Sequence, residues 1–288
     1  MKDFPIPVRM VGAGSQVEDE ELQYLEMPRG MTTFEMPRVP EKVDPAAMTA
    51  ARDLLAGYLA SLEGWDPTGA APGPRLDLIG TPAPVLTIVN QVLGEGEVSV
   101  RIGGERDLRI QESVFTGIWR ICEPAPDGTL ARDWIEAASI PAVAVESAQA
   151  TSAPTLVPVD LPPGAMNSPA LLREIGARLH DARPGAAPHV INLTLFPMSP
   201  EDHAVMEAAL GPGSVAMISR GFGNCHITST RARNVWRVQY FNNMKTLILN
   251  TIEVVHVPEE ALAAPEDLED SRTRLAELVD WMSESCTA

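Results

Sequence analysis

The residue pair best suited to chemistry is Cys225–His226, which lies just before the densest β pattern of the chain. A cysteine thiolate is a nucleophile and a soft metal ligand, and imidazole is a common second ligand. Gly221 and Gly223 flank the pair, so the sequence predicts that it lies in a loop. Two interpretations stay open: a thiol that binds a metal, a cluster or a partner's cysteines, or a free cysteine that packs as a small apolar side chain.

Other catalytic signatures are missing from the sequence. It contains no GxGxxG or Walker A pattern, and its five histidines show no HxxxH spacing. Asp202–His203 opens a predicted helix, where we interpret it as a surface cap. Cys122 and Cys286 are interpreted as structural or incidental. We therefore expect a protein that is not an enzyme and holds no cofactor.

The segment around Cys225 has an earlier copy in the same chain. Identical residues recur at a constant offset of 117 residues, as from Trp119 to Trp236, and no gap is needed. Cys225 and His226 correspond to Leu108 and Arg109, so the fold does not require the Cys–His pair. The matches indicate an internal duplication. They pair Gly94, Gly96, Gly104, Ile110, Trp119, Arg120, Leu130, Ile135, Glu136 and Pro141 with Gly211, Gly213, Gly221, Ile227, Trp236, Arg237, Leu247, Ile252, Glu253 and Pro258.

Each copy is predicted to be α+β, with helices packed on one face of a small mixed or antiparallel sheet. The first copy has a helix from Asp44 to residue 63, a short strand at 76–79, a helix at 82–93 and three strands near 97–102, 110–122 and 129–140. The second has a helix at 171–182, a strand within 189–197, a helix from Ser199 to Gly211, and strands ending in the hairpin 235–255. Asn242–Asn243 forms the hairpin turn, because Asn tolerates positive φ.

The predicted organisation has five parts. Residues 142–164 are rich in Ala, Ser, Thr and Pro without a clear period, which is typical of a linker. The parts are a Pro/Met-rich arm at 1–43, a first repeat at 44–145, a linker at 146–164, a second repeat at 165–262 and a C-terminal amphipathic helix at 263–288.

Several further residues are candidates for partner binding. The arm carries an acidic run with Glu18, Glu20 and Glu21, and it is either a strap packed on the domains or an adaptable docking segment. Arg120 with Glu136 and Arg237 with Glu253 are expected to pair across neighbouring strands, and Trp119 and Trp236 to anchor the cores. The remaining candidates are Gln111, Glu112 and Phe115 of the first half, and Arg233 and Asn234 beside the Cys–His segment.

Composition limits the function classes. The chain has 288 residues and a net charge of −17, which argues against nucleic acid and anionic membranes as partners and is compatible with a basic one. Three scattered cysteines predict a reducing compartment. The N-terminus lacks the apolar region of a signal peptide, and no apolar run approaches the roughly 20 residues of a membrane helix. We expect a cytoplasmic protein without a membrane span.

Four strings carry a family resemblance: FPIPVRMVGAGSQVEDEEL at 4–22, LGEGEVSVRI at 93–102, IQESVFTGIWR at 110–120 and GFGNCHITSTRARNVWRVQYFN at 221–242. In these strings the chain resembles the HupH/HyaF hydrogenase expression/formation proteins, nearly end to end. The resemblance implies an accessory protein of [NiFe]-hydrogenase maturation that acts in the cytoplasm on the iron–sulfur small subunit before twin-arginine export. It carries over no catalytic residues.

Two hypotheses follow. In the first, the protein is a chaperone that binds the small-subunit precursor through the arm and the 221–242 surface, with other maturation proteins as further candidate partners. In the second, it delivers or protects a small-subunit iron–sulfur cluster through Cys225, acting as a transient ligand with ligands from a partner, because four thiolates usually hold a cluster.

Overall fold

The computed structural model describes residues 44–69, 71–104, 107–221 and 223–285. The predicted arm, with Glu18, Glu20 and Glu21, and Cys286 lie outside the described residues. The statements below concern the described part of the chain.

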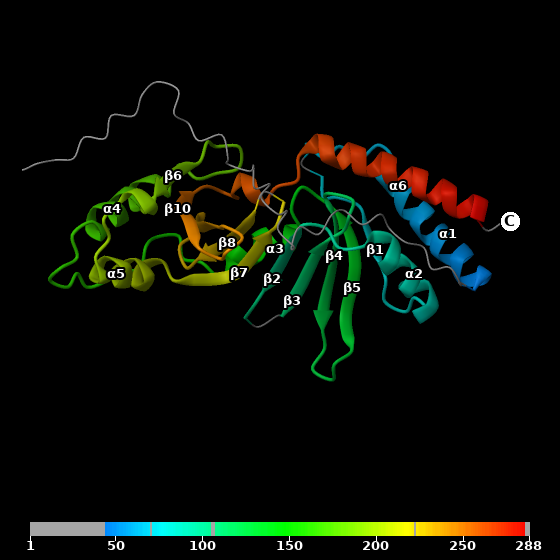
Figure 1. Cartoon of the computed structure of the whole chain (residues 1–288), viewed down its shortest axis with the longest axis horizontal. Coiled ribbons are helices and arrows are strands. Elements are labelled where there is room, and N and C mark those ends of the chain that lie inside the picture. The colour runs from blue at the N-terminus through cyan, green and yellow to red at the C-terminus, as the bar shows by residue number, and fades with distance from the viewer. Residues whose placement is uncertain (1–43, 70, 105–106, 222, 286–288) are drawn as a thin grey trace, which may run out of the picture. The chain divides into compact units, whose positions relative to one another are not determined.

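The two halves repeat the same series of elements (Figure 1). The first half contains α1 (Pro45–Leu62), β1 (Arg75–Asp77), α2 (Ala83–Leu93), β2 (Val98–Ile102), β3 (Leu108–Glu112), β4 (Ile118–Pro124), β5 (Leu130–Ala137) and α3 (Ala142–Ala150). The second contains α4 (Ser168–Arg178), β6 (His189–Asn192), the 3-10 turn η1 (Leu193–Leu195), α5 (Pro200–Leu210), β7 (Pro212–Ser219), β8 (Asn224–Thr230), β9 (Val235–Phe241), β10 (Leu247–Val254), the 3-10 turn η2 (Glu259–Ala261) and α6 (Pro265–Ser285). The bounds of α2 and α5, of β4 and β9 and of β5 and β10 differ by 117 residues at both ends, which confirms the duplicated α+β fold.

The strands of both halves form one ten-stranded sheet in the order β1-β5-β4-β3-β2-β7-β8-β9-β10-β6, and neighbouring strands run antiparallel. The halves join where β2 pairs with β7. In that pair Val100 lies opposite Met217, its own equivalent in the other half. The junction is therefore symmetric about this residue pair, as in an interface between two copies of one domain.

Three apolar clusters fix the two faces of the sheet, because successive side chains of a strand point to opposite faces. On one face, α1, α2 and α6 cover Ile118, Ile135 and Ala137 at one end, and α4 and α5 cover strand residues of β6, β9 and β10 at the other. On the opposite face α3 covers the central strands, and Trp119 and Trp236 are buried there as predicted. Neither the cluster beneath α1, α2 and α6 nor the cluster beneath α4 and α5 includes a residue of β2, β3, β7 or β8. The described helices therefore leave the middle of this face, which we call the first face, uncovered.

The structure corrects the predicted strand at 110–122. This segment forms two strands, β3 and β4, joined by a tight turn at 113–117. The Ser113 hydroxyl accepts a hydrogen bond from the Phe115 amide at 3.2 Å, and Gly117 adopts a positive φ of 78°. The sequence pattern marks this turn only weakly, because the turn contains no Pro, Asn or Asp.

Two other segments also differ from expectation. Within the segment interpreted as linker, Ala142–Ala150 form helix α3, whose Ala144 and Ala148 are buried. Alanine lacks a strong apolar signal, so the helical period was not visible. In the β9–β10 hairpin the positive φ of 60° belongs to Lys245, while the Asn242 side chain accepts hydrogen bonds from the Met244 and Thr246 amides.

Candidate functional site

Cys225 and His226 do not act as a pair, and they do not lie in a loop. Both belong to strand β8, where Cys225 lies between Ser219 of β7 and Tyr240 of β9. The Cys225 side chain is 4% exposed and packs in the central cluster. His226 points to the opposite face, where its ring centroid lies 4.7 Å from that of Phe241. Strand alternation therefore separates the thiol from the imidazole by the thickness of the sheet.

The surroundings of Cys225 disfavour thiolate chemistry. Burial raises the pKa of the thiol to about 11, and the nearby carboxylates of Glu260 and Glu253 act in the same direction. Only the thiolate is a good nucleophile or metal ligand, so at neutral pH this cysteine is inert. The packing interpretation fits this site.

The other candidates of the second half lie at opposite ends of β8. Gly221 and Gly223 belong to the turn that enters the strand, and Arg233 and Asn234 to the turn that leaves it. The Asn234 side chain donates a hydrogen bond to the Ala182 carbonyl at 2.8 Å, and the Arg233 amide donates to the Ala153 carbonyl at 2.8 Å. The fold does not bring these four residues together, and Asn234 has a structural role.

Two of the three first-half candidates are buried. Phe115 is 2% exposed and belongs to the cluster beneath α1, α2 and α6. Glu112 is 5% exposed, accepts a hydrogen bond from the Gly117 amide at 3.0 Å, and has its pKa raised to about 7 by burial. Gln111 is half-buried and donates to the Gly96 and Val98 carbonyls. Phe115 and Glu112 are therefore not accessible to a partner in this structure.

The predicted cross-strand ion pairs are wrong. Arg120 lies opposite Ile135, whereas Glu136 lies opposite Trp119, so the arginine and the glutamate point to opposite faces. Arg120 instead binds Asp133 through two contacts, Nε–Oδ1 at 3.0 Å and Nη2–Oδ2 at 2.7 Å. Glu136 binds Arg75 at 2.9 Å.

In the second half, Arg237 and Glu253 also point to opposite faces of the sheet, because Arg237 lies opposite Ile252 and Glu253 lies opposite Trp236. Arg237 lies 3.3 Å from the Asn250 amide oxygen and 3.5 Å from the Glu207 carboxylate. Asn250 is the equivalent of Asp133, so the second half has an amide where the first half has a buried carboxylate.

Asp202 caps a helix as predicted but is fully buried rather than at the surface. Its carboxylate accepts hydrogen bonds from the amides of Asn167, Ser168 and Ser199 and from the Ser168 hydroxyl. Although burial opposes ionisation, these hydrogen bonds hold the pKa of Asp202 well below its usual range. The residue thus joins the beginnings of α4 and α5.

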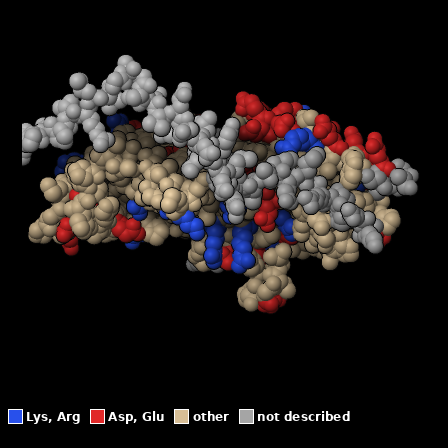
Figure 2. Space-filling model, in the orientation of Figure 1, with Lys and Arg blue, Asp and Glu red and all other residues tan. Residues whose placement is uncertain are grey.

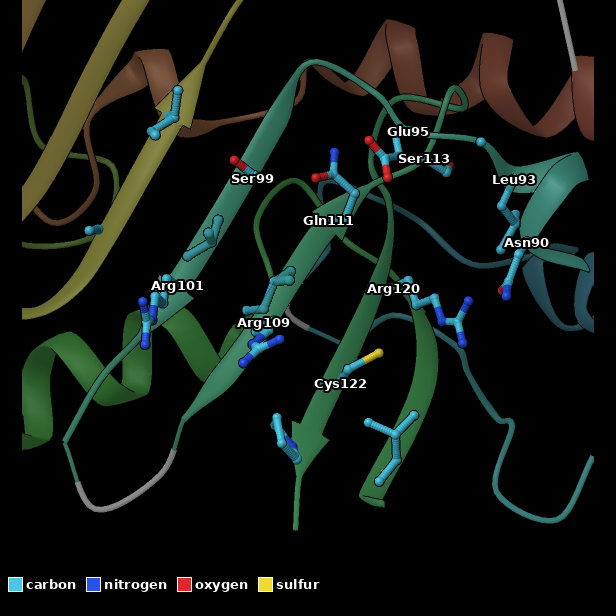
Figure 3. Close-up of a pocket in the computed structure, with 17 residues that line it drawn as sticks. Asn90, Leu93, Glu95, Ser99, Arg101, Arg109, Gln111, Ser113, Arg120 and Cys122 are labelled. Carbon is cyan, nitrogen blue, oxygen red and sulfur yellow. The ribbon is translucent and has the colours of Figure 1, made fainter. Parts of the chain in front are cut away.

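The open middle of the first face is accessible, and we call it the central face. It is hollowed beside α2 by a cavity of about 760 Å³ and beside α5 by one of about 200 Å³. Figure 3 shows Arg101, Arg109 and Arg120 on three adjacent strands at the larger cavity. The central face consists of Ser99, Arg101, Arg109, Gln111, Arg120, Cys122, Ala216, Ile218, His226, Thr228, Arg237 and Gln239.

Sequence reasoning found Gln111 and His226 of this face but missed its arginines as a group. A signal was present, because polar side chains occupy the second and fourth positions of both VSVRI and LRIQE. Assigning them to one face needed the pairing of the strands.

None of the described helices combines the length and apolar character needed to cross a membrane.

Comparisons with known proteins place these features in context. The sequence model of the HupH hydrogenase expression protein, C-terminal conserved region, matches residues 48–155 and again 165–282. The chain is 45% identical to the hydrogenase expression/formation protein HoxQ of Cupriavidus necator, over 98% of this chain and 99% of that protein. It is 40% identical to the hydrogenase expression/formation protein HupH of Rhodobacter capsulatus, with 97% and 98% coverage.

More distant matches have similar names. The hydrogenase-1 operon protein HyaF of Escherichia coli is 37% identical over 73% of this chain and 74% of its own length. A solved structure of the hydrogenase expression protein HupH from Thiobacillus denitrificans matches with a TM-score of 0.37 and 28% identity, covering 40% of this chain and 95% of that one.

Proposed function

The chain belongs to the HupH family of hydrogenase expression/formation proteins, and from this membership we propose that it is a non-catalytic accessory protein that binds the iron–sulfur small-subunit precursor of a [NiFe]-hydrogenase. Binding takes place in the cytoplasm, before twin-arginine export of the subunit. The observation that carries the proposal is the 45% identity, over 98% of the chain, to a hydrogenase expression/formation protein. A role in hydrogenase maturation follows from it directly.

The charge distribution supports a partner with a basic leader. Helix α6 carries seven carboxylates and two arginines, and Figure 2 shows Asp and Glu gathered along it. A twin-arginine leader is basic, so it is attracted to this helix. The body of the precursor then has the central face available as a second contact.

The alternative, cluster delivery through Cys225, is not supported by the site. A thiol that is 4% exposed and has its pKa raised to about 11 needs local opening of β8 before it can bind iron. A chaperone that binds the precursor through its surface needs neither an exposed nor an ionised thiol.

The test is capture of partners from cells that express the hydrogenase operon, using the tagged full-length chain and mass spectrometry. We expect to recover the small subunit with its leader attached. We also expect Cys225→Ala to recover it in the same amount, because the thiol faces the core. Recovery of only the large subunit or metal-insertion proteins contradicts the proposal, and loss of the small subunit with Cys225→Ala revives the thiol hypothesis.

A further inference from the structure

The central face has the opposite charge to the chain as a whole. The sequence contains 39 Asp and Glu against 22 Lys and Arg. Yet the residues that β2, β3, β4, β7, β8 and β9 direct to this face include four arginines and one histidine and no carboxylate, within the described strands. Figure 2 shows Lys and Arg gathered over β2 and β3.

Two of these arginines occupy positions at which their charges destabilise the sheet. Arg101 and Arg109 lie directly opposite each other on β2 and β3. Like charges at such positions destabilise a sheet. The duplicated fold does not impose the arrangement, because the equivalent residues of the second half are Ile218 and His226.

The local carboxylate only partly offsets this repulsion. Asp107 lies 3.2 Å from Arg101 Nε and 3.7 Å from Arg109 Nη2, so one carboxylate serves two guanidinium groups. The side chains of Arg101 and Arg109 remain 72% and 70% exposed. A guanidinium has five N–H donors, and the contact with Asp107 occupies only some of them in each arginine.

The third arginine of the central face differs, because a buried carboxylate binds its guanidinium group. Arg120 is 22% exposed and is held by the buried Asp133 through two contacts. Among the described residues, no carboxylate holds either of the two exposed arginines in this bidentate way, which is the geometry that a guanidinium group favours. The adjacent cavity of about 760 Å³ adds apolar walls from Leu93, Leu130 and Ile218.

We propose that Arg101 and Arg109, with the adjacent cavity, form a docking surface for a short acidic segment of the hydrogenase subunit that the chain accompanies. Its carboxylates bind the two guanidinium groups, and a neighbouring apolar side chain enters the cavity. This inference rests on the proposed function for the identity of the partner. A short acidic segment is favoured over nucleic acid, because nucleic acid carries a negative charge at every phosphate, and long-range repulsion by a chain with a net charge of −17 therefore weighs more heavily against it than against a few carboxylates.

The test compares two matched charge reversals in the full-length chain. Arg109→Glu changes the docking surface. Arg132→Glu changes an arginine of β5 on the opposite face, which is 62% exposed and lies 3.6 Å from Glu123, much as Arg109 lies from Asp107. In the capture experiment, we expect Arg109→Glu to reduce recovery of the small subunit by at least about tenfold and Arg132→Glu to leave it within about twofold of wild type. Thermal unfolding confirms that both variants are folded.

The outcomes separate the surface from the proposed function. If wild type and Arg109→Glu recover equal amounts of the subunit, the docking surface is wrong and the proposed function stands. If wild type recovers no hydrogenase subunit, the proposed function fails, and fluorescence anisotropy with a labelled peptide Glu-Glu-Leu-Glu-Glu tests the surface alone. Binding that Arg109→Glu abolishes and Arg132→Glu preserves supports the surface. Absence of binding, or tighter Arg109-dependent binding of a single-stranded oligonucleotide, overturns it.

Discussion

Replacing Gly96 with alanine is expected to lower the free energy of unfolding by about 3 kcal/mol, as overpacking at a site without room does. A Cβ built on Gly96 overlaps the Ser113 carbonyl oxygen, and the Gly96 amide donates a hydrogen bond to the Glu112 carbonyl at 2.7 Å. The backbone of the segment after α2 therefore lies directly against the turn between β3 and β4. Because that turn is backbone, it cannot move aside as a flexible side chain does. The measurement is chemical unfolding of wild type and variant.

The duplication supplies a second example, and helix α1 supplies a control. A Cβ on Gly213, the equivalent of Gly96, would overlap the Ser229 hydroxyl oxygen and lie 2.8 Å from the Thr230 carbonyl oxygen, so Gly213→Ala is also expected to destabilise the protein. Gly57 is exposed inside α1, and a Cβ there meets nothing within 4 Å. Gly57→Ala is therefore expected to stabilise the protein by about 1 kcal/mol. Loss of less than about 0.5 kcal/mol in Gly96→Ala contradicts the close packing of the segment.

Replacing Glu253 with glutamine is expected to stabilise the protein by about 2 kcal/mol at pH 8 and to have little effect below pH 4.5. Glu253 is 6% exposed, and burial, followed by the charge of Glu260, raises its pKa to about 7. The carboxyl group accepts a hydrogen bond from the Thr251 hydroxyl at 3.1 Å, and Val190 lies opposite it on β6. Glutamine has nearly the same shape and carries no charge to bury.

The pH dependence has a definite sign. A folded-state pKa of about 7, against an ordinary value of 4.5, means that the folded protein holds the proton more tightly. The stabilisation from the neutral group is therefore fully present below pH 4.5 and is lost as the pH rises to about 7. Glu112, whose pKa is also about 7, adds to the same trend. Thermal unfolding between pH 4.5 and pH 8 measures both.

The first half provides the matched control for this prediction. Glu136 occupies the equivalent position but lies 2.9 Å from Arg75. Glu136→Gln removes an ion pair instead of an uncompensated charge, so it is expected to give no stabilisation at pH 8. Equal effects of the two substitutions contradict the assignment of Glu253 as an uncompensated buried carboxyl group.

The duplication and the class of each half could be predicted from sequence, because identities at one fixed offset need no structural information. Trp119 and Trp236 were placed correctly for the same reason, since large apolar residues kept in both copies are core residues. The helix α5 was predicted from Ser199, Pro200 and the acidic residues that follow, and Ser199 and Asp202 form the observed capping box.

The errors in the strands share one physical cause, which is that the face to which a strand residue points depends on where the turns lie and on how the strands pair. A turn at 113–117 that contains no Pro, Asn or Asp led to the prediction of β3 and β4 as one strand. The register of β4 with β5 then decided that Arg120 meets Asp133 and not Glu136. Strand alternation likewise placed Cys225 in the core and His226 on the central face. Long-range pairing of β2 with β7, which creates that face, left no local trace in the sequence.

The central claim, that the chain binds the small-subunit precursor, is tested most directly by calorimetric titration of the purified chain with the purified precursor. Parallel titrations use the same subunit without its leader and the large subunit. The account predicts that the precursor binds most tightly, that removal of the leader weakens binding, and that the large subunit does not bind. Binding of the large subunit alone, or of none of the three, contradicts it.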